Sequence, residues 1–297
     1  MANIITKSSA NGWDIPKRRL RLTLSGTNIF NALTEDVNVK FNTVEAVSGG
    51  LTEANITITG IAVRKMFALS TSTTQWVENW TQNTISIVAG YYNNSAQIFT
   101  GNIIEGKPNL DTADYSVTLK AVNPFEQMTR YKGYCFPGTV PVSTIVAQMA
   151  ADADMGFVDA LQDNSYVLNN FATREASIVD NIRMISSAIP VDIYISNNRL
   201  YLKKIGERGS GMATFYVNAR NMIGAPTPTP TGCRVRIKMT AGVRSGQPVS
   251  VTSKKYPQLN SIKFFLSRIA HVGDTRGADW YTELELVKEG LGWFNNE

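Results

Sequence analysis

The sequence predicts a mainly β protein with an α+β insertion, in which two β-barrel domains are related by internal duplication. Three observations support this fold class. Apolar and polar residues alternate over short runs in both terminal regions, as they do in half-buried strands. Helical patterns occur only between these regions, and the two regions share a spaced motif. The 297 residues are enough for about two domains.

The first β-barrel domain is predicted to comprise residues 1–125. Short apolar-polar alternations are separated by Gly, Asn, Asp and Pro, as expected of consecutive strands joined by turns. The stretch 63–80 has no clear period, and "STSTT" within it is predicted to be a loop. Strands are expected at 19–24, 37–41, 55–61, 84–89, 97–104 and 115–122.

Residues 126–222 are predicted to form an α+β middle domain. "PVSTIVAQMAADADMG" spaces its apolar residues along one helix face, with Ser143 placed to cap the helix and Gly156 to end it. "TREASIVDNIRMISSAIP" repeats this pattern and ends at Pro190. "VDIYISNNRLYLKK" then predicts two strands around Asn197-Asn198, a pair suited to the positive φ of a tight turn.

The segment "GAPTPTPTG" predicts a linker at residues 223–232. Its alternating prolines favour an extended and fairly stiff chain between two domains. A docking site for a proline-binding module is the alternative interpretation. Residues 233–297 return to a β pattern and are assigned to the second β-barrel domain and a C-terminal tail.

Composition and charge restrict the classes of function. The formal net charge is +5, and the densest basic clusters, 17–21 and 234–238, alternate with apolar residues as a solvated strand face would. A nucleic-acid surface is the alternative for these clusters. The chain shows neither a signal-peptide pattern nor an apolar run of roughly 18 residues, so we expect no membrane span and synthesis in a cytoplasm.

The sequence offers little for metal or cofactor chemistry. Cys135 and Cys233 lie far apart, and His271 is the single histidine, so a zinc site of the usual Cys/His type is not expected. The calcium-loop, phosphate-loop, dinucleotide and serine-nucleophile motifs do not occur. We therefore expect no metal and no cofactor.

The two β regions share a pattern that extends over about 40 positions. "NSAQIFTGNI" begins at Asn94 and "NSIKFFLSRI" begins at Asn260, with identical spacing from Asn-Ser to Phe and Ile. Each is followed by Asp-Thr, and then by Ala-Asp before Tyr115 or Trp280. This repetition predicts an internal duplication of one β unit. The positions expected to be equivalent are Phe99 with Phe265, Ile103 with Ile269, and Asp111 with Asp274.

The duplication also decides how His271 is interpreted. His271 stands near Asp274 and Trp280, which suggests a site, but the spacing places it where the first copy has Glu105. A ligand or base would not be replaced by an unrelated polar residue. We therefore predict a turn in which the histidine is dispensable and partly exposed.

Close carboxylates are the remaining argument for an enzyme. Asp152 and Asp154 lie at a predicted helix end, and Asp111 and Asp114 lie in a predicted turn. A glycosidase needs two acids that face each other across a cleft, and close neighbours in one element do not supply that geometry. The sequence therefore predicts no catalytic residue and a protein that is not an enzyme.

Two stretches resemble a known family. "ISIVAGYYNNSAQIFTGNI" resembles a strand-loop-strand signature of baseplate hub proteins from tailed bacteriophages. "QPVSVTSKKYPQLNSIKFFLSRIAHVGDTRGADWYTELE" resembles the final β domain of the same proteins, which are relatives of the late control D family. The resemblance covers most of the chain and rests on strands, glycines and aromatic residues. Unlike longer relatives, the chain shows no appended lysozyme or peptidase domain and no long C-terminal spike.

The resemblance implies that each chain supplies two tail-tube-like β-barrels to a homotrimer. Three chains would form a pseudo-sixfold ring that connects the tail tube protein to the central spike protein, beside other baseplate proteins. The expected location is the virion, in the baseplate of the tail, after assembly in the host cytoplasm. The lumen of the ring is a candidate route for DNA.

Two other classes of function stay open at this stage. One is a phage cell-wall hydrolase acting during entry, with Asp152 or Asp154 as an acid. The other is a monomeric β protein that binds carbohydrate or nucleic acid, with salt-dependent affinity in the latter case. For a hub, the trimer interface is expected at aromatic residues that a lone barrel does not explain, and packing onto the same chain is the alternative. These residues are Trp76 and Trp80 in "WVENW", and Trp293 and Phe294 in "GLGWF".

Overall fold

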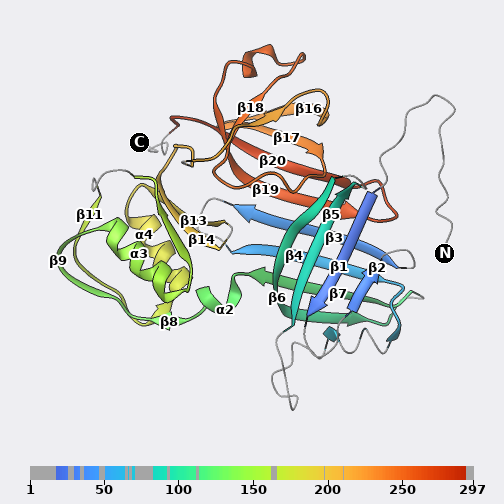
Figure 1. Ribbon diagram of the computed structural model, residues 1–297, viewed down its shortest axis with the longest axis horizontal. Helices are drawn as coiled ribbons and strands as arrows, with labels where there is room; N and C mark the ends of the chain where they lie inside the picture. Colours follow the sequence, from blue (N-terminus) through green and yellow to red (C-terminus); the bar gives the residue numbers. More distant parts are fainter. Residues whose placement is uncertain are drawn as a thin grey trace.

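A computed structural model describes residues 18–25, 30–33, 37–46, 51–63, 66, 69–70, 83–91, 94–111, 114–161, 166–196, 198–209 and 211–291. The described chain is mainly β, as the sequence predicts. Its principal element is a curled, largely antiparallel sheet to which both terminal regions contribute, and a smaller α+β unit lies beside one end of it (Figure 1).

The first β unit contains every strand predicted for the N-terminal region. Alternate residues of each strand enter one apolar cluster, which includes Leu22 of β1, Ile56 of β4 and Ile87 of β5. The hairpin partner of β1, β2, has no counterpart in the predicted strands. The strands are β1 (Arg18–Ser25), β2 (Phe30–Leu33), β3 (Asn38–Ala46), β4 (Thr52–Thr59), β5 (Thr84–Tyr91), β6 (Asn94–Asn109) and β7 (Ser116–Asn123).

The middle unit has its own apolar cluster, built from the buried faces of α3 and α4 and the strands next to them. Both predicted helices are confirmed. The expected cap Ser143 lies inside α3, whereas Ser177 caps α4 by accepting a hydrogen bond from the Asp180 N–H at 3.2 Å. The elements are α2 (Phe125–Met128), β8 (Tyr131–Lys132), β9 (Cys135–Pro141), α3 (Val142–Asp152), β10 (Gly156–Asp159), β11 (Val167–Ala172), β12 (Ala176–Ser177), α4 (Ile178–Ala188), β13 (Val191–Ser196) and β14 (Arg199–Lys204).

The second β unit begins earlier than the sequence predicts. Residues 223–232 are not a linker between domains, because Met222–Thr229 forms strand β16, which pairs with β17. The preceding strand, β15, pairs with β18 of the same unit. The elements are β15 (Phe215–Val217), β16 (Met222–Thr229), β17 (Gly232–Lys238), β18 (Pro248–Val251), η1 (Pro257–Leu259), β19 (Phe264–Asp274) and β20 (Trp280–Lys288).

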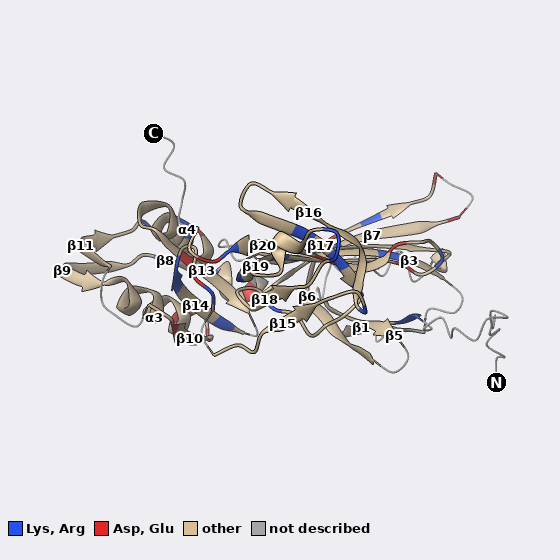
Figure 2. Cartoon of the chain, turned by 90° about the horizontal axis from the view of Figure 1, so that it is seen from above, with Lys and Arg blue, Asp and Glu red and all other residues tan. Residues whose placement is uncertain are grey.

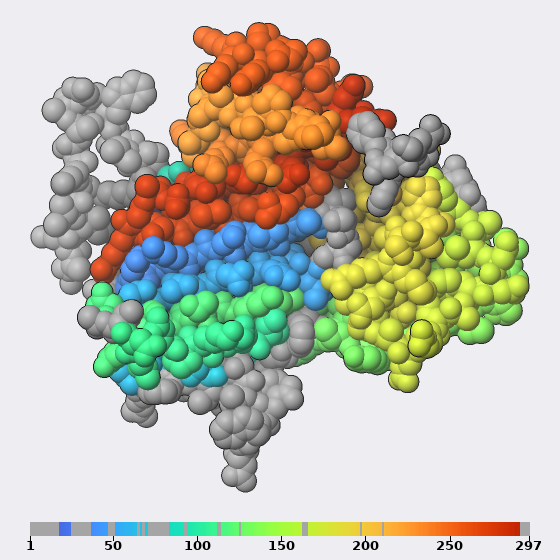
Figure 3. Space-filling model, turned by 180° about the vertical axis from the view of Figure 1, so that it is seen from behind, coloured from blue at the N-terminus to red at the C-terminus, as the bar shows by residue number. Residues whose placement is uncertain are grey.

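Five strands in each β unit follow the same order. The order is β3-β4-β7-β6-β5 in the first unit and β16-β17-β20-β19-β18 in the second. The units join where β19 pairs with β3, so the orange and red strands continue into the blue and green strands as neighbouring bands (Figures 1 and 3). The units differ beyond this block, since β1 pairs antiparallel with β5 whereas β15 pairs parallel with β18. The common order supports the duplication.

The strand register shifts the predicted equivalences by three residues. Asn102 lies opposite Val122 in the first unit, and Phe265 lies opposite Val287 in the second. One residue further on, the Ile103 N–H donates to the Asn83 carbonyl and the Leu266 N–H donates to the Gln247 carbonyl, both at 2.9 Å. A bulge follows in both ladders, between Ile103 and Glu105 and between Leu266 and Arg268.

Phe99 and Ile103 are therefore not equivalent to Phe265 and Ile269. The sequence match aligned residues of one chemical type, whereas backbone pairing sets the register, and a shift by an odd number of residues changes the face of a strand. The same count assigns Pro108, rather than Glu105, to the position of His271. The same count leaves Asp111 equivalent to Asp274, as the sequence predicts.

The basic cluster at 234–238 is a solvated strand face paired with acids. Lys and Arg lie along β17 in Figure 2, and two of these arginines contact the neighbouring strand β20. Arg236 Nε donates to Glu283 at 2.9 Å, and Arg234 lies 3.7 Å from both Glu283 and Glu285. This pairing weakens the case for a nucleic-acid surface on β17. Among the described residues, no helix is long and apolar enough to cross a membrane.

Candidate assembly interface

The two β units are joined inside the chain by a ladder between β19 and β3. The ladder spans Arg268–Asp274 and Lys40–Ala46, and it places His271 opposite Thr43. Both of these side chains are buried. The junction is therefore a continuous part of the sheet, and not a contact between two finished barrels.

His271 lies in strand β19 and not in a turn, so that prediction is wrong. Its Nδ1 is 2.9 Å from Thr282 Oγ1, and Thr282 Oγ1 also accepts the Thr240 N–H at 3.2 Å and donates to Met239 Sδ at 3.7 Å. Burial lowers the pKa of His271 to about 4. The imidazole is thus neutral at pH 7, and its buried position in the ladder makes it a packing residue.

Trp280 fastens the start of β20 to the first β unit. Its side chain is 3% exposed, its Nε1 donates to the Gly90 carbonyl at 3.2 Å, and its ring meets Phe41 edge-on with centroids 5.7 Å apart. Arg18 of β1 also contacts this tryptophan, with its guanidinium carbon 5.6 Å from the Trp280 ring centroid. The guanidinium also donates to the carbonyls of Asp274, Gly277 and Ala278.

The predicted Asp-Thr turn is present in the second copy. Asp274 accepts the N–H groups of Arg276 and Gly277, and Thr275 Oγ1 accepts the Val39 N–H at 2.9 Å. Burial opposes ionisation of Asp274, but these two N–H donors and Lys40 outweigh it and lower the pKa of the carboxyl. In the first copy Asp111 is described and the residue after it, Thr112, lies outside the described residues.

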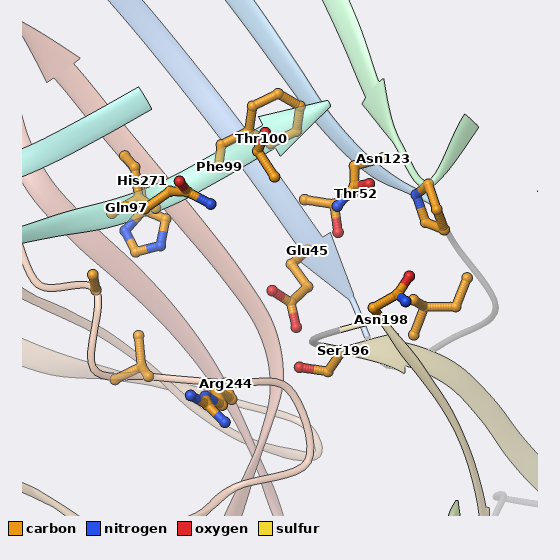
Figure 4. A pocket seen from close by; sticks show the side chains of 15 residues that line it. Glu45, Thr52, Gln97, Phe99, Thr100, Asn123, Ser196, Asn198, Arg244 and His271 are labelled. Carbon is orange, nitrogen blue, oxygen red and sulfur yellow. The ribbon is translucent and has the colours of Figure 1, made fainter. Parts of the chain in front are cut away.

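A cavity of about 420 Å³ opens where the two β units and the middle unit meet. Figure 4 shows Glu45 of β3 pointing into it, with Thr52 and Gln97 from the first unit, Ser196 from the middle unit and Arg244 from the second. Polar groups from all three units line one space, so the cavity depends on how the units are held together.

Glu45 is the central acid of this cavity. Its Oε1 accepts the Ser245 N–H at 3.3 Å, which links β3 to the loop before β18. Burial raises the pKa of Glu45, against the lowering effects of Ser245, Ser196 and Arg244. The described residues contain no group of three or more His, Cys, Asp or Glu side chains arranged to hold a metal ion.

The middle unit is anchored to the second β unit by a buried lysine. Lys203 is 1% exposed, and its Nζ lies 2.6 Å from Asp192 Oδ2 and 4.6 Å from the ring centroid of Phe265. Burial lowers the pKa of Lys203, while Asp192 opposes that shift. The buried ammonium of Lys203 is stabilised by the carboxylate of Asp192 and by the ring face of Phe265.

Asp152 and Asp154, the acids considered for a hydrolase, each form an ion pair with a basic side chain. Asp152 accepts from Lys132 Nζ at 2.6 Å and from Gln148 Nε2 at 3.2 Å, and Arg130 Nη1 lies 2.6 Å from Asp154 Oδ2. Burial raises the pKa of Asp152, but Lys132, Tyr134 and Gln148 outweigh this effect and hold the pKa below its usual value. A general acid in a glycosidase needs a raised pKa.

The predicted interface aromatics Trp76, Trp80, Trp293 and Phe294 lie outside the described residues. Of the duplicated positions, Phe99, Phe265, Ile103 and Ile269 are buried. Phe99 and Ile103 lie in the apolar cluster of the first β unit, whereas Ile269 lies in a separate apolar cluster of the second β unit.

Sequence reasoning missed the residues that hold the three units together. Arg18 belongs to a basic cluster in the sequence, and Glu45 is one charge in an alternating strand. The pairing of Lys203 with Asp192 follows from the predicted hairpin, but the contact of Lys203 with Phe265 does not. The partners of these residues lie up to 260 residues away in the chain. Only the fold brings these groups together.

Comparisons with known proteins place the chain in a family. The model of the family described as "Baseplate hub gp41" matches residues 19–286, so the chain belongs to that family. No curated protein sequence matches it.

Solved structures with the same fold have little sequence identity to the chain. The 43 kDa tail protein of prophage MuSo2 from Shewanella oneidensis is 8% identical, with a TM-score of 0.59 over 91% of this chain and 98% of that one. The E. coli c3393 protein, a type VI secretion component, is 12% identical, with a TM-score of 0.59 over 92% and 78%. A tail protein from Neisseria meningitidis MC58 is 12% identical, with a TM-score of 0.58 over 93% and 98%.

Proposed function

We propose that three copies of this baseplate hub protein form a pseudo-sixfold ring that connects the tail tube to the central spike. The observation that carries the proposal is the strand order shared by the two β units of each chain. With two such units per chain, a threefold oligomer offers six similar surfaces to a sixfold tube and keeps threefold symmetry for a spike.

The junction inside the chain supports a way to close this ring. The sheet runs from β16 through β19 and β3 to β6, with four strands from each unit. Beyond Asn102, no described strand pairs with β6 on the side opposite β7. In β19 the corresponding stretch pairs with β3. The equivalent neighbour for β6 is β16 of another copy.

The family and similar structures support the assignment of partners. The c3393 protein is described as similar to the T4 tail proteins gp27 and gp5, and a further match, with a TM-score of 0.54 at 7% identity, is a PdpA-VgrG complex. We assign the tail tube protein, the central spike protein and other baseplate proteins as partners. The ring resides in the virion after assembly in the host cytoplasm, and its lumen is a route for DNA.

The role is structural and not enzymatic. Asp152 and Asp154, the acids of the alternative hydrolase, are held by Lys132 and Arg130, and their arrangement gives no general acid. A peptidoglycan clearing assay on the purified chain tests this point. Clearing that disappears in Asp152→Asn or Asp154→Asn would favour the hydrolase. We keep Trp76, Trp80, Trp293 and Phe294 as candidate interface residues.

The test of the ring is a mass measurement in solution combined with electron-microscopic class averages. The chain alone, and the chain mixed with the tail tube protein, are compared at matched concentration. We expect particles of three chains with six similar lobes, formed at least in the presence of the tube protein. Single chains under both conditions would contradict the ring, and particles of six chains would contradict the use of both β units.

A further inference from the structure

Prolines alternate with threonines at the end of β16, where Pro226 and Pro228 lie in the strand and Pro230 lies in the turn that follows. β16 pairs with β17 on one side and ends the strand order of the described sheet on the other. Proline has no N–H, so a sheet accommodates it where the missing donor faces away from the partner strand. Thr227, Pro228 and Thr229 lie in regular register with β17, so the nitrogen of Pro228 faces the free side while the two threonine N–H groups face β17. Pro226 lies in the bulge between Ile223 and Thr227, and Pro230 lies in the turn before β17.

The first copy has an N–H donor at the position equivalent to Pro228. Counting through the ladders of β4 and β17 places Thr43 at the position of Pro228. In β3 this edge is the one that pairs with β19. Equivalent edges of the two units thus differ in their capacity to donate.

The other strand of the junction shows the same difference. Pro108 of β6 occupies the position of His271 in β19. The Thr275 N–H, just beyond β19, donates to the carbonyl of Val39 in β3 at 3.0 Å. Because donors alternate between the two sides of a strand, the His271 N–H also faces β3. At that position β6 has no donor.

We propose that β16 of one copy seats on residues 105–109 of β6 in a second copy, across a seam that prolines on both strands keep weak. The inference rests on the proposed ring and specifies its contact between chains. Pro108 then faces Pro228, where the junction inside the chain pairs His271 with Thr43. Gly106 and Leu110 keep N–H donors on either side of Pro108, whereas Pro108 and Pro228 themselves supply none.

The prolines also explain how free copies avoid sticking to one another. An unpaired strand edge is a template for open-ended pairing, and proline is one of the means by which such an edge is blocked. In such a seam β6 donates backbone hydrogen bonds and Pro228 of β16 donates none. We expect it to hold when six β units close a ring, and to be too weak to extend into an open sheet of many chains. The three seams between chains are therefore the places where the ring opens first.

Cysteine cross-linking tests the position of the seam. Lys107 and Thr229 correspond to Ala270 and Val44, which lie opposite each other inside the chain. In a Cys135→Ser background, Lys107→Cys with Thr229→Cys should give a covalent three-chain product under mild oxidation, because opposite residues of a ladder lie within disulfide reach.

Three controls define the cross-link. Ala270→Cys with Val44→Cys should close within one chain and leave its mass unchanged. Lys107→Cys with Thr227→Cys is out of register by two residues and should react at least about tenfold more slowly. Single chains that never assemble would overturn both the ring and the seam. Trimers without the 107–229 product would overturn the seam alone.

Restoring the missing donors tests the role of the prolines. Pro108→Thr with Pro228→Thr recreates a pair that can exchange two backbone bonds, as His271 and Thr43 can. We expect the trimer to dissociate on dilution about tenfold more slowly, with larger oligomers in preparations without partner proteins. Pro137→Thr adds a donor in β9 of the middle unit, away from the seam, and should change neither. Unaltered dissociation of the double variant would overturn the proline seam.

Discussion

The two β units share a strand order and differ at the edges that meet their neighbours. Both bury alternate apolar residues, as Ala54, Ile56 and Ile58 do in β4 and Cys233, Val235 and Ile237 do in β17. At the edges, His271 and Thr43 pair inside the chain, whereas Pro108 and Pro228 hold the same positions elsewhere. The difference shows that buried alternation is common to both units, whereas the backbone donors of the edge strands are not: the edges paired inside the chain keep N–H groups where the other two edges have proline.

The aromatic residue that starts the last strand differs in the same sense. Trp280 is 3% exposed and contacts the other unit, whereas Tyr115, before β7, is 42% exposed. The sequence match treats them as one position. Trp280 therefore anchors the second unit to the first, whereas the side chain of Tyr115 is largely solvated.

Truncating this aromatic residue should have the largest effect. We expect Trp280→Ala to lower the free energy of unfolding by about 3–5 kcal/mol, because it removes a buried indole and its hydrogen bond to Gly90. Tyr115→Ala should cost less than about 1 kcal/mol, since its side chain is largely solvated. Urea titrations of both variants check the comparison, and equal losses would show that Trp280 is not an anchor.

A charged residue at the centre of the junction should be nearly as disruptive. His271→Glu was expected from the sequence to be tolerated, but a carboxylate in this buried site should cost about 2–5 kcal/mol. Pro108→Glu places the same residue at the equivalent exposed position and should leave the single chain almost as stable as before. Thermal unfolding of the two variants tests the comparison. A stable His271→Glu chain would mean that the ladder opens easily.

Acid should weaken the junction through the same histidine. The pKa of His271 is about 4 in the folded chain and near 6.5 when solvated, so the folded state disfavours protonation. The stability it contributes is complete above pH 6.5 and is lost as the pH falls from 6.5 to 4, by on the order of 3 kcal/mol. His271→Gln should lack this component of the pH profile. Identical profiles from pH 7 to 4 would contradict the buried neutral state.

The middle unit should depend on the second β unit more than on the first. Lys203 rests on Phe265, whose equivalent in the first unit is Asn102. Asp192→Ala leaves Lys203 buried without its carboxylate and should cost about 2–3 kcal/mol. Lys203→Met keeps the volume without a charge and should cost less than about 1 kcal/mol. Chemical denaturation distinguishes the two, and a larger loss for Lys203→Met would invert the assignment.

The sequence predicted the fold through patterns that burial imposes. Alternation located the strands, and helical spacing located α3 and α4, because both follow from which residues face a core. Sequence patterns failed where strand pairing, and not burial, determines the structure. "GAPTPTPTG" looked like a linker because alternating prolines suit an isolated extended chain, and its role as an edge strand depends on β17.

The candidate interface was less accessible to sequence reasoning. Phe99 and Phe265 matched in type but lie three ladder positions apart in register, and His271 looked like a turn residue because its partner Thr43 is distant in the sequence. The contacts of Arg18 with residues 274–278, of Glu45 with Ser245 and of Lys203 with Phe265 join segments that are distant in the sequence, so no local spacing encodes them.

A density map of the assembled hub, determined by electron cryomicroscopy with its tube partner, tests the central claim most directly. The account predicts three chains in one ring, with six superimposable β units. Three junctions should place His271 beside Thr43, and three seams should place Pro108 opposite Pro228 of the next chain. A ring in which β16 faces solvent, or in which one β unit of each chain lies outside the ring, would contradict the account.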